Sequence, residues 1–115
     1  MTTPTEHPHP DPVRDILIAA ADLLDPDGAW TQRELARGPG GQATSPQAED
    51  AVSWCAIGAI TRVSRAADIQ DYRKARARLA ETLSREGYKD IAQWNDTRGR
   101  IRPQVVRMLR RAAAA

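Results

Sequence analysis

Residues 46–66 read PQAEDAVSWCAIGAITRVSRA, and apolar residues recur in this stretch every three or four positions. That recurrence predicts a helix over the whole range. Trp54, Ile57 and Thr61 share one face of this helix. A second, small-sided face carries Ala48, Val52, Cys55, Ala56, Ala59 and Val63. Because both faces would be covered, we expect the central helix of a bundle, in which Gly58 and the alanines let a neighbour approach closely.

Further helices are predicted on both sides of this one. Asp11 has the side chain of an N-cap and Pro12 suits a first helical turn, so a helix is expected over 11–24. Periodic apolar residues predict a helix over 69–86, which Gly87 would end. A turn or two is expected at 90–94, and a last amphipathic helix opens at Pro103.

The stretch from Trp30 to Leu35 carries a helix-start pattern. Thr31 and Glu34 have the spacing of a capping box, which predicts a short helix that ends before the glycine-rich residues 38–45. Those glycines predict a flexible loop, and a brief hairpin around it is the alternative.

The predicted fold class is therefore all-α: a small single-core bundle of about five helices, two of them short, around the central helix 46–66. A chain of 115 residues fits one domain. Residues 1–10 are polar and proline-rich and predict a disordered tail, which leaves 11–115 as a single helical domain. The core is expected to be thin, because the chain has only 19 Ile, Leu and Val residues and no Phe.

Charge is divided unevenly along the chain. Residues 1–50 carry a net charge of −6 and residues 51–115 carry +8. Such a chain can neutralise itself across its own fold, pair with a copy, or bind an anionic partner. The single cysteine cannot form an internal disulfide, no apolar run is long enough to span a membrane, and no secretory signal is evident, so we expect a cytoplasmic location.

Two motifs carry a resemblance. The segment Trp54-Cys55-Ala56-Ile57-Gly58-Ala59 and the later Trp94-Asn95-Asp96 together resemble an uncharacterised family of small actinobacterial and phage proteins. The resemblance covers most of residues 13–112. The chain departs from the family pattern at 101–103, where a threonine helix cap is expected, and in a longer basic stretch at 62–78. The resemblance supports the domain boundaries and implies no activity.

Cys55 with Asn95 and Asp96 is the candidate for nucleophilic chemistry. A thiolate needs a neighbouring base or cation, and the only two histidines, His7 and His9, lie in the proline-rich tail. The alternative is that Cys55 is a small buried apolar residue. The sequence therefore assigns no catalytic residue beyond these candidates. His7, His9 and Asp11 give no fixed geometry for a metal, and no metal site is expected. No cofactor is expected.

A ligand pocket is a second interpretation of the same motifs. Its candidate residues are Trp54, Cys55, Gly58, Trp94, Asn95 and Asp96. The alternative is structural: the tryptophans fill the core of a protein without phenylalanine, and Asn95 and Asp96 end a helix and start a turn.

Six arginines form a predicted basic patch with no acid among them: Arg98, Arg100, Arg102, Arg107, Arg110 and Arg111. Such a helix face can lie against phosphates, although no helix-turn-helix pattern or exposed aromatic alternation accompanies it. The alternative is a solvated surface.

The function predicted from the sequence is a non-catalytic interaction or regulatory module whose partner is an acidic protein or a second copy. Nucleic-acid binding through the C-terminal arginines is the first alternative. A small-molecule-binding protein or enzyme with a pocket near Cys55 and Asn95-Asp96 is the second. No membrane partner is expected.

Overall fold

The computed structural model describes residues 10–115, and about half of the chain is helical. Residues 10–115 contain five helices and a small three-stranded antiparallel sheet, whose strands lie between the first and second helices. The sequence predicted an all-α fold, and the sheet shows that the fold is not purely α-helical. The elements are α1 (Pro12–Leu24), β1 (Ala36–Arg37), β2 (Ala43–Thr44), β3 (Ser53–Trp54), α2 (Ala56–Val63), α3 (Ile69–Ser84), α4 (Ile91–Asn95) and α5 (Arg102–Ala114).

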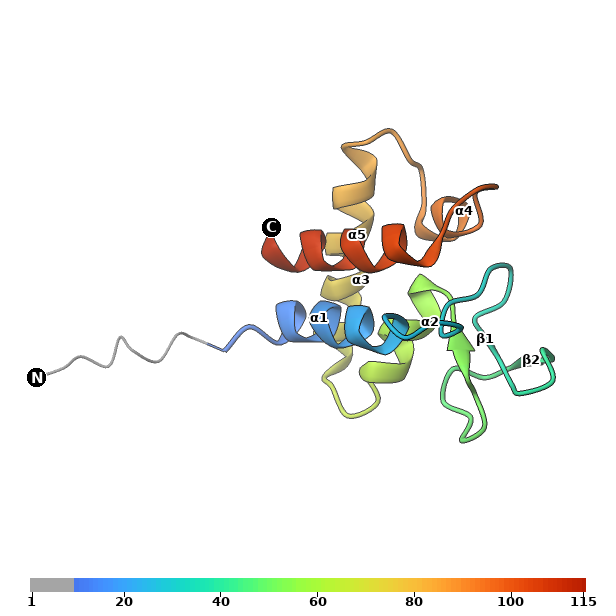
Figure 1. The fold of residues 1–115 in the computed structure, drawn as a ribbon. Coiled ribbons are helices and arrows are strands. Elements are labelled where there is room, and N and C mark those ends of the chain that lie inside the picture. Colours follow the sequence, from blue (N-terminus) through green and yellow to red (C-terminus); the bar gives the residue numbers. More distant parts are fainter. Residues whose placement is uncertain (1–9) are drawn as a thin grey trace, which may run out of the picture.

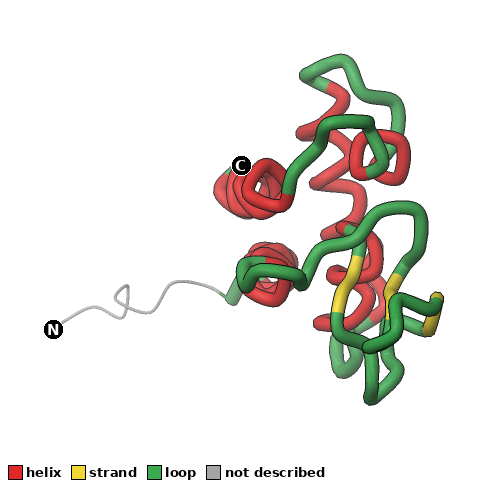
Figure 2. Tube along the Cα trace, turned by 45° about the vertical axis from the view of Figure 1, so that its right-hand side comes forward, coloured by secondary structure: helices red, strands yellow, loops and turns green. Residues whose placement is uncertain are grey.

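Helices α1 and α5 run side by side in opposite directions and form the most extensive helix contact of the fold (Figure 1). Helix α1 begins where the sequence predicts, because the Asp11 side chain accepts a hydrogen bond of 3.0 Å from the Arg14 amide and Pro12 occupies the first turn. Figure 2 looks along this pair, with the sheet lying to one side of it. The first and last helices of the chain therefore pack against each other, and both contribute to the core.

Helices α3 and α4 also lie close to their predicted positions. Helix α3 ends at Ser84, and Gly87 follows with a φ of 92°, the left-handed conformation expected of a helix-ending glycine. Helix α4 is a short helix capped by Asp90, whose side chain accepts from the Gln93 amide at 2.6 Å.

The predicted central helix 46–66 is wrong in its first half. Only 56–63 is helical, and Ser53–Trp54 forms β3, which pairs with β1. The Trp54 amide donates to the Ala29 carbonyl at 2.9 Å and the Cys55 amide to the Leu35 carbonyl at 3.2 Å. Strand pairing with distant residues therefore replaces the local bonds of a helix, as the β-favouring residues Val52 and Trp54 allow.

The predicted short helix beginning at Thr31 does not form. Residues 32–35 form bends, and Arg33 adopts a φ of 72°. The hairpin alternative is confirmed: β1 pairs antiparallel with β2 around the glycine-rich turn, and β1 lies between β2 and β3. The capping-box pattern is overridden because these backbone groups bond to residues far away in the chain, as described below.

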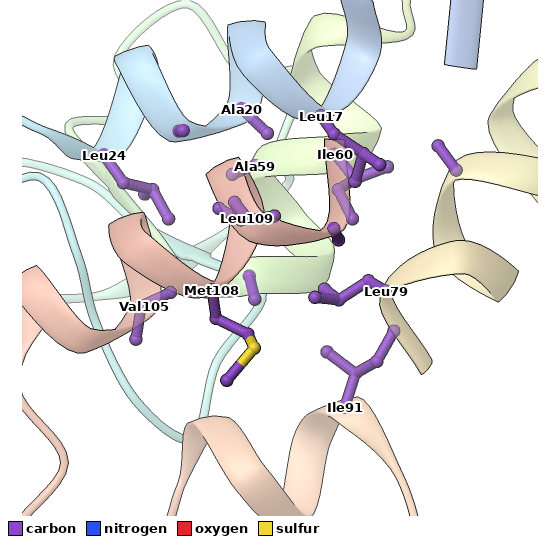
Figure 3. Close-up of a cluster of buried hydrophobic side chains, with 14 of the residues drawn as sticks. Leu17, Ala20, Leu24, Ala59, Ile60, Leu79, Ile91, Val105, Met108 and Leu109 are labelled. Carbon is purple, nitrogen blue, oxygen red and sulfur yellow. The ribbon is translucent and has the colours of Figure 1, made fainter. Parts of the chain in front are cut away.

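One apolar cluster draws on all five helices. Figure 3 shows part of it: α1, α2 and α5 each contribute several of the labelled side chains, while α3 and α4 contribute Leu79 and Ile91. The fully buried members include Leu17, Leu24, Ile60, Leu79, Leu83, Val105 and Leu109. No helix within residues 10–115 combines the length and the apolar composition needed to cross a membrane.

Candidate functional site

Asn95, at the end of α4, joins three separate parts of the chain. It is almost fully buried, and its Oδ1 accepts from Trp30 Nε1 at 2.8 Å and from the Ala56 amide at 3.0 Å. Its Nδ2 donates to the Thr31 carbonyl at 3.2 Å and to Asp96 Oδ1 at 3.0 Å. Because both donor hydrogens and both acceptor positions are engaged, this amide is committed to the fold.

The neighbouring residues add further hydrogen bonds between the segment 30–33 and the end of α4, and these contacts together are called the clamp. Asp96 Oδ1 also accepts from the Arg33 amide at 2.9 Å. Gln32 Nε2 donates to the carbonyls of Asn95 and Thr97, at 3.0 Å and 3.1 Å. This clamp explains why residues 31–34 leave the helical conformation that their own sequence favours.

Cys55 caps α2 rather than lying within it. Its Sγ accepts from the Gly58 amide at 3.3 Å. Burial raises the pKa of the Cys55 thiol, and the Asp96 carboxylate raises it further, although backbone amides at the start of α2 oppose both effects. The thiol is therefore less ionised at neutral pH than an ordinary cysteine.

Cys55, Asn95 and Asp96 line one small cavity of about 130 Å³, together with residues 33–35. The other three pocket candidates lie outside its lining. Trp54 donates from Nε1 to the Pro46 carbonyl, with Arg62 stacked on its ring at 5.3 Å. Gly58 is packed so closely that a Cβ atom there would lie 1.9 Å from the Leu35 carbonyl oxygen.

A larger cleft of about 520 Å³ lies next to this cavity, between α3 and the start of α4. Ile57 and Ala92 line both spaces. The cleft has an apolar wall of alanines and isoleucines, and Arg76, Lys89 and Asp90 lie at it. Arg76 falls among the apolar residues of the predicted helix 69–86, and this placement is the feature of the sequence that could have indicated the cleft.

The six arginines of the predicted basic patch differ in their partners. Arg102 pairs with Asp25 and Asp27, and Arg110 pairs with Asp22 and Asp25. These pairs join the basic end of the chain to the acidic end of α1. Of the three uses that the charge imbalance allowed, the structure therefore shows internal neutralisation for part of the charge.

The other four arginines have different surroundings. Arg111 pairs with Glu86 at 2.6 Å, whereas Arg98 and Arg107 are exposed and take part in no ion pair within the described residues. Arg100 lies over the rings of Trp94 and Tyr88, at 4.7 Å and 5.4 Å from the ring centroids. Of the six, Arg98 and Arg107 are therefore the exposed arginines that form no ion pair among residues 10–115.

The model of DUF6197, a family of unknown function, matches residues 8–115. The chain belongs to this family. No curated protein and no solved structure matches this DUF6197 chain. The family match names no activity for the chain.

Among residues 10–115, no group of three or more His, Cys, Asp or Glu side chains is placed so that it could hold a metal ion. His7 and His9 lie outside the described residues.

Proposed function

We propose that this domain is a non-catalytic interaction module that binds an acidic segment of a partner protein in the cleft between α3 and α4. The observation that carries the proposal is that one 520 Å³ cleft combines an apolar wall with two cations that form no ion pair within residues 10–115. An acidic segment with an apolar side chain complements both features.

The two cations are held differently. Arg76 Nη1 donates to Tyr72 Oη at 3.3 Å, and its guanidinium lies 5.8 Å from the Tyr72 ring centroid. Lys89 is exposed, and neither side chain forms an ion pair among residues 10–115. The nearby Asp90 is engaged as the cap of α4. Both cations are thus free to meet carboxylates from outside.

A separate partner fits this surface better than a second copy. The most acidic segment of the chain, at the end of α1, already pairs with Arg102 and Arg110 of the same molecule. A head-to-tail dimer would have to break those pairs or use other acids.

The two tryptophan motifs support a structural role rather than catalysis. The amide of Asn95 is fully engaged, and the pKa of the Cys55 thiol is raised rather than lowered. We infer that Trp-Cys-x-x-Gly-Ala and Trp-Asn-Asp are the scaffold signature of the actinobacterial and phage proteins that the chain resembles. The proposal includes a single domain over 11–115 and a cytoplasmic location, in keeping with one unpaired cysteine.

Fluorescence anisotropy with synthetic peptides tests the cleft. The probe is a labelled peptide of leucines flanked by glutamates, and the reference peptide has lysine at each glutamate position. We expect the acidic peptide to bind, more weakly at high salt, and the Lys89→Glu variant to lose this binding. Lys74→Glu is the matched control, because Lys74 is exposed on α3, outside the cleft lining, and changes the net charge equally.

Four results would contradict the proposal. Equal affinity for the acidic and the lysine peptide would show that the cleft does not select acidic segments. An equal loss of affinity in Lys89→Glu and Lys74→Glu would show that binding does not occur in the cleft. A salt-sensitive dimer in light scattering would favour self-association. Salt-dependent binding of duplex DNA that survives Lys89→Glu and fails on Arg107→Gln would favour the nucleic-acid alternative.

A further inference from the structure

A third cavity, of about 210 Å³, lies on a different part of the molecule, where α5 faces Trp94 and the segment after α3. Its polar lining includes Arg100, Gln104, Arg107, Arg111 and Glu86. No residue of the α3–α4 cleft lines it, so it is independent of the proposed function.

Arg100 is held in place before any ligand arrives. Its guanidinium lies over the Trp94 and Tyr88 rings, and its Nε donates to the Trp94 carbonyl at 3.0 Å. Its Nη2 is buried and has no hydrogen-bond partner among the described residues. A buried guanidinium nitrogen without a hydrogen-bond acceptor is energetically unfavourable, so a ligand oxygen atom that accepts from Arg100 Nη2 would be stabilising.

The charge of the lining points to an anion. Three arginines face one acid, and that acid, Glu86, is paired with Arg111 at 2.6 Å. Arg100 and Arg107 are left without a carboxylate within residues 10–115. Two uncompensated guanidinium groups suit a doubly charged oxyanion better than a single carboxylate.

We propose that this cavity binds a phosphate group, through Arg100 and Arg107 with the Gln104 amide as a further donor. A space of about 210 Å³ is smaller than the roughly 300 to 1,000 Å³ of pockets for drug-sized ligands. It therefore suits the phosphate group itself, either as free inorganic phosphate or as the end group of a phosphorylated side chain.

Calorimetric titration of the full chain with inorganic phosphate tests the site, with tryptophan fluorescence as a second readout because Arg100 covers Trp94. We expect saturable binding that Arg107→Gln weakens by about tenfold. Arg98→Gln is the matched control, since Arg98 is also exposed but does not line the cavity, and it should bind as the wild type does. Because Arg107 is exposed, its replacement is expected to leave the fold intact.

A phosphoserine peptide and its unphosphorylated form distinguish the two sources of the phosphate group. Tighter binding of the phosphopeptide, with the same dependence on Arg107, would identify a phosphorylated protein as the source. Binding no tighter than that of inorganic phosphate would identify the free anion. The proposal is overturned if inorganic phosphate shows no saturable binding, or if Arg98→Gln and Arg107→Gln weaken it equally.

Discussion

Asn95 has the largest expected effect of any single polar residue. Replacement by alanine leaves three groups without their partner: the buried Ala56 amide and the partly buried Trp30 Nε1 and Thr31 carbonyl. Each such loss costs about 1 to 3 kcal/mol, so we expect Asn95→Ala to lower the free energy of unfolding by about 3 to 5 kcal/mol in urea denaturation. Gln93→Ala on the same helix is the control, because the Gln93 side chain is exposed, and should be nearly neutral.

Gly58 should reverse the usual effect of a helical glycine. Alanine normally stabilises a helix interior relative to glycine by about 1 kcal/mol. Here the added Cβ would lie 1.9 Å from a backbone oxygen, so Gly58→Ala must move either α2 or the segment before β1. We expect it to destabilise the fold by about 2 kcal/mol in thermal denaturation.

The control for that substitution is Gly40→Ala, whose Cβ would meet only the end of the flexible Gln42 side chain and should change stability little. A stabilised Gly58→Ala variant would show that the contact between α2 and the Leu35 carbonyl is not as close as described.

Cys55 makes the stability of the fold depend on pH in the alkaline range. Because its pKa is raised in the folded chain, the thiol contributes stability that is present below the pKa of an unfolded cysteine and is lost as pH rises through the folded value. We expect the stability difference between wild type and Cys55→Ser to fall over that alkaline range. Iodoacetamide should modify Cys55 more slowly at neutral pH in the folded chain than in urea, and an equal or faster rate would contradict the raised pKa.

These residues also show how far the sequence leads at this scale. It singled out Cys55, Asn95 and Asp96, and the structure brings all three to one cavity. What it could not show is that Asn95 bonds to residues more than sixty positions earlier, since nothing in Trp-Asn-Asp specifies a distant partner. The α3–α4 cleft and the 210 Å³ cavity lined by Arg100 are formed by packing between elements. Of the two, only the cleft had a sign in the sequence, which was the placement of Arg76.

Helices with complete local signals are the elements that the sequence predicted well. Helix α1 has its cap and proline at the start, and α3 has its glycine at the end. The helices predicted at 31–37 and 46–55 were wrong because the backbone groups of these segments bond to each other and to the end of α4. The spacing of residues along the sequence does not indicate such long-range pairing. A start signal such as Thr31–Glu34 therefore predicts a helix only where no distant partner competes.

The hairpin of β1 and β2 depends on Arg37. Its guanidinium donates to Thr31 Oγ1, the Gly41 carbonyl and the Gln32 carbonyl, at 2.8, 2.9 and 3.1 Å. Lysine cannot supply this planar set of donors, so Arg37→Lys should raise the amide exchange rates of 36–44 by about tenfold while leaving the helices protected.

Arg33→Lys is the matched control for the hairpin, because the Arg33 side chain is exposed and only its backbone amide bonds to Asp96. Equal exchange in the two variants would mean that the strand pairing alone holds the hairpin.

At the scale of the whole molecule, opposite charges that are far apart in the sequence meet in the fold. The end of α1 and the helix α5 are about eighty residues apart, and four ion-pair contacts join them. These contacts are largely exposed, so each contributes little to stability. Their main consequence is that the surplus charge available to partners is smaller and more localised than the sequence suggested.

The shared core predicts that the described chain unfolds as one unit. The apolar cluster includes residues of all five helices and of β1 and β3, so no element keeps an independent core. Trp94 is buried in this cluster, and its fluorescence therefore reports the core while far-ultraviolet circular dichroism reports the helices. We expect both signals to follow one urea transition.

Leu109→Ala, at a fully buried position of α5, should lower the free energy of unfolding by about 2 to 5 kcal/mol and shift both midpoints equally. If the helical signal persisted after the fluorescence change, the α1–α5 pair would be a separate unit, and the sheet with α4 would be only attached to it.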